Sequence, residues 1–282
     1  MTISTHLAPL LTSRPIVLWV EDRLTKEYLS EVWQADDALI QILVAGGNDA
    51  VTGVVHDLRG QGYHHVFGFA DRDFKSSNKD KWLQVTSGIV VFRPTVLEIE
   101  NFLLDWDALA GCDENCRKNR TSDEIRERAE NYVRTSIWWM SCRNVLSEIR
   151  SRLVDDYPHH PTMEKVQSCE EAMAYIKTNR GWLDTFPGHA EHIMNFDEIE
   201  KSLHSAYDKL SQSFENGQWF HEFSGKEIYR HVRGYLFNEK YAGVEAMDID
   251  LAKSVAKWQS TNESLPEELL ELSAALKMRV GI

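Results

Sequence analysis

The sequence is poor in the features that mark exported and membrane-embedded proteins. No uncharged run approaches the roughly 18 residues of a membrane-spanning helix, and residues 1–14 lack the charged start and long apolar core of a signal peptide. Only four of the 282 residues are cysteines, and without export signals these predict reduced thiols instead of a disulfide framework. We therefore expect a cytoplasmic protein without membrane contact.

Basic residues are also scarce relative to acidic ones. The 31 Lys and Arg residues, against 44 Asp and Glu residues, leave a net charge of −13. Because neutralised phosphates supply much of the affinity for nucleic acid, this balance excludes a general nucleic-acid coat. Any contact with nucleic acid must be local, assisted by a metal or shared with a partner protein.

Two apolar runs in the first part of the chain end in carboxylates. They are residues 16–20, followed by Glu21 and Asp22, and residues 67–70, followed by Asp71 and Asp73. Continuous apolar runs are typical of strands buried on both faces of a parallel sheet, and the carboxyl ends of such strands meet at one edge. If the second strand continues, Asp71 and Asp73 point to the same side, about 7 Å apart, and can share one hard cation. The alternative is an Asp-rich turn after the strand.

The elements around these two runs complete an alternating pattern of strands and helices. The predicted order is a helix over 23–34, a strand over 39–44, a turn at 45–49, a helix through residue 58, the strand before Asp71, a fourth strand over 88–92 and a helix over 96–109. With right-handed crossovers, this order predicts an α/β fold built on a Rossmann-like parallel sheet.

The pattern changes to long helices after a charged segment at 113–120, which we interpret as a linker. Apolar residues from 122 to 153 recur at threes and fours, which predicts one long amphipathic helix or two in succession. Further helices are predicted over 164–178, 196–214, 225–236, 249–259 and 266–278. We therefore expect an α/β domain at 1–115 and an all-helical domain at 116–282.

A short motif in the second half, Ser224-Gly225-Lys226 followed by Glu227, shares residues with a phosphate-binding P-loop. The first glycine of that loop is absent and no strand precedes the motif, so ATP binding is not expected. Ser224 and Glu227 instead have the spacing of a capping box at a helix start. Lys226, Arg230 and Arg233 then give this helix a basic side, which meets a nucleic-acid backbone or a partner's acidic patch, or is simply solvated.

Taken together, these motifs resemble a known fold family. Glu21 after the first strand, the glycine-bearing turn at Gly46-Gly47-Asn48 and the Asp71-x-Asp73 pair look like the TOPRIM fold shared by topoisomerases, DnaG-type primases and OLD-family nucleases. Residues 97–104 and 223–228 are similar to a branch of TOPRIM-like proteins that includes the AriB effector of PARIS phage defence. The TOPRIM likeness covers about the first 110 residues, roughly one small domain.

The resemblance implies a magnesium-dependent nuclease, with manganese as a possible substitute. Its catalytic and metal-binding residues would be Glu21, Asp71 and Asp73. Supporting roles near the metal are implied for Asp22, Glu100, Asn101 and Lys226. The 1–115 segment would be the catalytic domain, and 116–282 would serve dimerisation, partner or substrate contacts.

The same resemblance implies a biological setting. It predicts a toxic antiviral effector that cleaves RNA such as tRNA, is controlled by a partner ATPase of the ABC type and is active as a homodimer. The chain has neither a tyrosine-bearing topoisomerase domain nor a zinc-binding primase module, which favours hydrolysis over strand passage or primer synthesis.

One position departs from the TOPRIM pattern. The family has Gly directly after the glutamate and Asp three residues beyond, whereas this chain has Asp22 and Thr25. Loss of the second acid would weaken one metal position unless Asp22, Glu27 or Glu100 replaces it. Three alternatives therefore stay open: a catalytically impaired TOPRIM-like scaffold or regulatory subunit of an ATPase assembly, a DNA-directed TOPRIM nuclease, and a nucleotide-processing or primer-making enzyme.

Overall fold

The computed structural model describes residues 8–73, 81–85, 88–117, 119–152, 161–178, 196–237 and 244–282. Backbone contacts divide the chain into two compact units. The first unit consists of Met1–Arg72, Ser77–Arg126 and Gly225–Ile282, and the second of Asp73–Ser76 and Glu127–Ser224. This division differs from the expected boundary at 115/116, because the last third of the helical half groups with the sheet.

The first unit is built on a five-stranded sheet in the order β2-β1-β3-β5-β4. The strands are β1 (Ile16–Val20), β2 (Ile40–Val44), β3 (Val66–Phe69), β4 (Trp82–Val85) and β5 (Gly88–Phe92). Four of them run parallel, and β4 pairs antiparallel with β5 at the edge. The predicted α/β class with a Rossmann-like parallel sheet is confirmed, whereas β4 had no counterpart in the sequence prediction.

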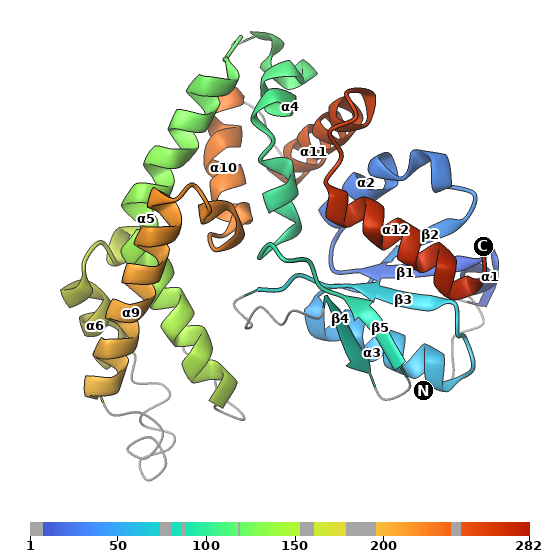
Figure 1. The fold of residues 1–282 in the computed structure, drawn as a ribbon, viewed down its shortest axis with the longest axis horizontal. Coiled ribbons are helices and arrows are strands. Elements are labelled where there is room, and N and C mark those ends of the chain that lie inside the picture. The colour runs from blue at the N-terminus through green and yellow to red at the C-terminus, as the bar shows by residue number, and fades with distance from the viewer. Residues whose placement is uncertain are drawn as a thin grey trace. The chain divides into compact units, whose positions relative to one another are not determined.

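The strand order reverses at β1, which lies between β2 and β3. Helix α2 (Arg23–Val32) connects β1 to β2, and α3 (Asn48–Gly60) then carries the chain back past β1 to β3. The two helices lie on opposite faces of the sheet (Figure 1), as expected for right-handed crossovers that run in opposite directions. Ligands of open α/β sheets usually bind at such a reversal, which here lies at the carboxyl ends of β1 and β3.

The C-terminal helices complete the core of the first unit. They are α10 (Gly225–Leu236), α11 (Val244–Thr261) and α12 (Glu267–Val280). Helix α11 packs along α2, and the buried Tyr28 hydroxyl donates to Gln259 Oε1 at 2.8 Å. The Trp33 indole N–H, just after α2, donates to the Leu269 carbonyl at 3.2 Å. These contacts bind the end of the chain to its beginning, and in Figure 1 α11 lies beside α2.

The single helix predicted over 96–109 is wrong. The chain forms a 3-10 turn, η2 (Ile99–Leu103), and then the short helix α4 (Trp106–Gly111). Glu98 before η2 is extended, with φ −140° and ψ 158°, and the Asp105 side chain accepts from Ala108 N at 3.0 Å to start a new helix. Two capping acids therefore interrupt an apolar pattern that would otherwise suit one helix.

The expected linker at 113–120 contains a second 3-10 turn, η3 (Asp113–Arg117). The Asn115 side chain within it is buried and donates to the carbonyls of Ala110 and Arg120 at 2.8 and 2.7 Å. The segment over 113–120 is thus a folded turn that leads into the next helix, because Asn115 forms hydrogen bonds with the backbone of the turn.

The first unit also contains α1 (Ala8–Thr12) and η1 (Gln34–Asp36).

The second unit is helical. Its described elements are most of α5 (Ser122–Arg152), η4 (Met163–Lys165), α6 (Cys169–Thr178), α9 (Phe196–Glu215) and η5 (Trp219–His221). The long helix predicted from 122 to 153 is confirmed as one helix. Trp138 stacks on Tyr207 with ring centroids 3.9 Å apart, and the Trp139 N–H donates to Pro161 O at 2.8 Å, so these tryptophans pack inside the unit.

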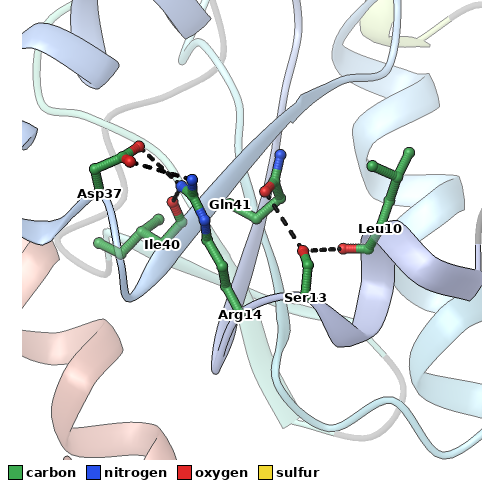
Figure 2. A network of polar contacts seen from close by, with 6 residues as sticks. All are labelled: Leu10, Ser13, Arg14, Asp37, Ile40 and Gln41. Atoms are coloured by element: carbon green, nitrogen blue, oxygen red, sulfur yellow. Dashed lines mark hydrogen bonds and ion pairs between the residues drawn. The ribbon is translucent and has the colours of Figure 1, made fainter.

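Polar contacts fasten the amino edge of the sheet, opposite the carboxylate-bearing ends. Figure 2 shows the Arg14 guanidinium reaching both Asp37 oxygens, at 2.9 and 3.2 Å, and the Ile40 carbonyl at 2.7 Å. Ser13 donates to Leu10 O at 3.1 Å beside them. This bidentate pair ties the start of β1 to the start of β2.

In the described part of the chain, none of the helices has both the length and the apolar composition needed to cross a bilayer.

Candidate functional site

Glu21 and Asp71 meet at the carboxyl edge of the sheet, on the two strands that flank the reversal of strand order. Each follows its strand closely, Glu21 after β1 and Asp71 two residues after the end of β3. The Asp71 backbone N–H donates to Glu21 Oε1 at 2.7 Å, across a sequence separation of 50. The structure therefore brings together two of the three predicted metal-binding acids.

Backbone donors and an amide hold this pair in place. Ile99 N donates to Asp71 Oδ1 at 3.0 Å, and the Asn48 side chain, at the start of α3, donates to the Asp71 carbonyl at 2.9 Å. Gly46 and Gly47 let the chain turn between β2 and α3, because their φ values of 101° and 152° suit glycine. The glycine-bearing turn predicted from the sequence thus delivers Asn48 to the acid edge.

The strand does not continue to Asp73, so the chain has the alternative arrangement, a turn after the strand. Strand β3 ends at Phe69, and Asp73 has a φ of 51°, in the left-handed region that Asp tolerates better than most residues. Arg72 between the two acids is buried, and its Nε donates to the Val96 carbonyl at 3.4 Å. Asp73 groups with the second unit, so the acid pair that the first unit assembles is Glu21 with Asp71.

Asp22 and Thr25, which depart from the TOPRIM pattern, form the start of α2. Asp22 is the N-cap, and its Oδ1 accepts from Thr25 N at 2.8 Å. Thr25 is only 2 % exposed. The position that carries the second acid in the TOPRIM motif is therefore a buried helix position here, and Asp22 is held by a backbone donor.

Glu98 and Asn101 link η2 to the start of α10. Asn101 Oδ1 accepts from Glu98 N at 3.0 Å, and the two residues form a capping box. Glu98 Oε2 also accepts from Lys226 N at 2.8 Å, across 128 residues. A Cβ on Gly225 would overlap the Asn101 backbone nitrogen, so glycine is needed there for α10 to approach. Glu98 was not among the predicted site residues, because no local signal indicates this distant contact.

Glu100 is the most perturbed acid at this edge. Glu100 is only 5 % exposed. It directly follows Ile99, whose backbone N–H donates to Asp71. The pKa of Glu100 is raised to about 8, because burial and the neighbouring Glu98 carboxylate together outweigh the opposing effect of the Lys226 ammonium. Burial of a carboxyl group disfavours its charged form, so Glu100 is largely protonated near neutral pH. The predicted supporting residues Asp22, Glu100 and Lys226 line one cleft together.

The donor set of Glu21 and Asp71 suits magnesium. Mg²⁺ prefers oxygen ligands and is often bound by one or two carboxylates, with waters and substrate phosphates completing its coordination. Within the described ranges, no group of three or more His, Cys, Asp or Glu side chains is placed to hold a metal ion. A magnesium ion at this edge would therefore rest on these two carboxylates and on the substrate.

Chemically, this edge combines two fixed carboxylates with a buried protonated acid and a lysine from a distant helix. Such a set can bind a hard cation, orient a phosphate and move a proton. A scan against protein-family models gives no match for this chain, and a search of curated proteins gives none either.

Proposed function

We propose that the chain is a magnesium-dependent TOPRIM nuclease that hydrolyses phosphodiester bonds. The observation that carries this proposal is the contact between Asp71 N and Glu21 Oε1, 2.7 Å long, at the point where the strand order reverses. Open α/β sheets bind ligands at this point, and two carboxylates here supply hard oxygen ligands. The order of strands, glycine turn and acids agrees with the TOPRIM resemblance.

In the proposed mechanism, Asp71 would hold Mg²⁺ or Mn²⁺ together with Asp73, the other predicted aspartate ligand, and Glu21 would either complete the metal shell or act as the general acid or base. When bound, the ion supplies positive charge that stabilises the phosphoryl group as negative charge develops on it. The Asp71 N–H orients Glu21, and where Glu21 is not a metal ligand its carboxylate would transfer the proton. The Ile99 N–H donates to Asp71 Oδ1 and so holds the Asp71 carboxylate at this edge of the sheet.

The proposed substrate is RNA such as tRNA, in a toxic antiviral effector that a partner ATPase of the ABC type restrains. The branch resemblance supports this, because the two segments that carry it, around Glu98 and around Lys226, dock on each other at 2.8 Å beside the acid pair. The net charge of −13 is consistent with recognition that is local or shared with a partner. We propose a homodimer as the active form.

A second candidate is a TOPRIM-like regulatory subunit without catalysis. The buried Thr25 in place of the second acid favours it. Calorimetric titration with Mg²⁺ and Mn²⁺ separates the two candidates. Binding that is lost in Asp71→Asn supports the nuclease, and no binding at millimolar metal supports the regulatory subunit.

The decisive experiment incubates the purified full chain with labelled tRNA and DNA pools, with and without Mg²⁺. We expect metal-dependent cleavage, and we expect Glu21→Gln and Asp71→Asn each to slow it by about 10²–10⁴-fold, the usual contribution of a positioned acid or base. Asp37→Asn is the matched control, because Asp37 is an acid at the opposite edge of the same sheet. Cleavage at the wild-type rate by folded Glu21→Gln and Asp71→Asn proteins would refute the proposal.

A further inference from the structure

A cleft of about 330 Å³ opens beside the acid pair, within the first unit. It is lined by the first turn of α2, by Glu100 of η2 and by residues of α10 and α11. Two of its lining residues adjoin the proposed catalytic centre in sequence. Asp22 follows Glu21, and Glu100 follows Ile99, whose N–H binds Asp71. A group bound in the cleft therefore lies next to the proposed reaction site.

The inner wall of the cleft carries the Glu100 carboxyl group. This side chain is only 5 % exposed, and its hydrogen-bond partner in the described ranges is its own backbone N–H. A carboxyl group can form several hydrogen bonds, and leaving buried bonding capacity unused costs about 1–3 kcal/mol, so Glu100 keeps capacity that a ligand in the cleft can use. Asp22 does not use this capacity, because its carboxylate is held by Thr25 N.

Lys226 lines the same cleft from α10. Its ammonium lowers the pKa of Glu100, yet among the described residues it has no carboxylate within ion-pair distance. Its backbone N–H is already taken by Glu98, so the side chain is what it offers to a ligand. The neighbouring Arg230 is bound to Glu227 at 3.1 Å. Arg23, which also lines the cleft, pairs with Glu27 at 4.0 Å. Among the described lining residues, Lys226 is thus the basic side chain without an ion pair, and Glu100 is the buried carboxyl group.

We propose that this cleft binds one nucleotide of the substrate, with Lys226 contacting its phosphate and Glu100 hydrogen-bonding a sugar hydroxyl. A volume of about 330 Å³ lies at the small end of ligand pockets and suits one nucleoside-sized group. A protonated carboxyl group both donates and accepts, which matches a hydroxyl group. The buried Tyr229 ring forms part of the wall, and its hydroxyl is bound to Asp248 O at 2.8 Å, so the ring is fixed.

This inference rests on the proposed nuclease function, because the cleft adjoins Glu21 and Asp71. The cleft residues would hold a nucleotide, whereas Glu21 and Asp71 would act in breaking the bond. Nucleotide binding and cleavage can therefore be measured separately.

The test is titration of the full chain with adenosine 5′-monophosphate, in EDTA and on a Glu21→Gln background so that no cleavage occurs. Binding is followed by calorimetry or by backbone amide shifts. We expect Lys226→Met and Glu100→Ala each to weaken binding by about tenfold or more, as the loss of one charge-assisted or buried hydrogen bond does. Glu100→Gln, which still donates and accepts, should restore most of the affinity.

The matched control is Lys257→Met, because Lys257 is an exposed lysine of α11 outside the cleft lining. Thermal unfolding of each variant checks that it is folded. A second titration uses the 2′-deoxy nucleotide. If the wild type binds it more weakly than the ribonucleotide and Glu100→Ala binds the two equally, Glu100 contacts the 2′-hydroxyl. If the wild type binds the two equally and Glu100→Ala weakens both, Glu100 contacts the 3′-hydroxyl.

Absence of nucleotide binding, or affinity unchanged in both Lys226→Met and Glu100→Ala, would overturn the inference. A chain that binds the nucleotide in the cleft but cleaves no nucleic acid would overturn only the proposed nuclease. Conversely, if the wild type cleaves RNA and Glu100→Ala has the same KM, only the proposed nucleotide binding in the cleft would be overturned.

Discussion

At the scale of single residues, Glu100 has the most unusual environment of the proposed site. It is almost fully buried beside Glu98, and its pKa is raised to about 8 from an ordinary value of 4.5. The folded protein therefore binds the Glu100 proton more tightly than the unfolded chain does. Below pH 4.5 both states hold the proton, and above it the unfolded chain releases it first, so stability falls as the pH rises toward 8.

Glu100→Gln should remove this pH dependence. Glutamine has nearly the same shape and no proton to lose, so the variant should match the wild type at pH 5 and exceed it at pH 8, by on the order of a few kcal/mol. Urea unfolding of both proteins at pH 5, 6.5 and 8 measures the difference. Histidines and other acids titrate in both proteins, so their contributions cancel in the difference between the two free energies of unfolding. Parallel stability curves for the two proteins would show that Glu100 titrates normally.

At the scale of elements, the junction of η2 and α10 positions the cleft. The Gly225 backbone lies directly against Asn101, and Glu98 accepts from the next residue of the helix. The sequence motif around Gly225 therefore serves close packing of two elements and not phosphate binding by a P-loop.

Gly225→Ala is expected to destabilise the protein by about 1–3 kcal/mol, because the added methyl group meets backbone that cannot move aside. It should also reduce the proposed nucleotide binding and the proposed nuclease activity, because a displacement of α10 moves Lys226. Gly234→Ala is the control on the same helix: a Cβ there meets nothing within 4 Å, so the variant should gain about 0.5–1 kcal/mol. Chemical denaturation of the two variants measures both effects, and equal stability of the two would exclude the predicted clash.

At the scale of the whole molecule, the first unit is assembled from three segments of the chain. Helix α11 covers α2 with the buried Leu251, Ala252 and Val255, and Gln259 joins the Tyr28 hydroxyl to the Phe102 carbonyl. Removing this helix would expose apolar surface on α2 and leave a buried tyrosine hydroxyl without its partner.

A fragment of residues 1–115, the catalytic domain expected from the sequence, should therefore not fold by itself. Its circular dichroism and amide spectra should be those of a largely unfolded chain, whereas the full chain unfolds cooperatively. Adding residues 225–282 in trans should restore structure, because they supply α10, α11 and α12. A stable, folded 1–115 fragment would show that the C-terminal helices are dispensable for the sheet.

The sequence by itself determined the parallel sheet, the edge to which Glu21 and Asp71 are delivered, and most of the helices. Strands produce alternating apolar residues or continuous apolar runs, and amphipathic helices produce an apolar period of about 3.6 residues. These patterns are local, so they predict elements without knowledge of any distant contact. The predicted position of Asp73 failed because a strand pattern carries no mark of where the strand stops, and β3 ends at Phe69.

Only the tertiary structure decided which distant residues complete the site. Nothing in the sequence around Glu98 indicates a partner 128 residues away, and nothing around Tyr28 indicates Gln259. Such contacts depend on packing between whole elements, on the space that Gly225 leaves for Asn101 and on the burial that raises the pKa of Glu100. These are properties of the assembled three-segment unit, because close packing and desolvation arise only when its elements meet.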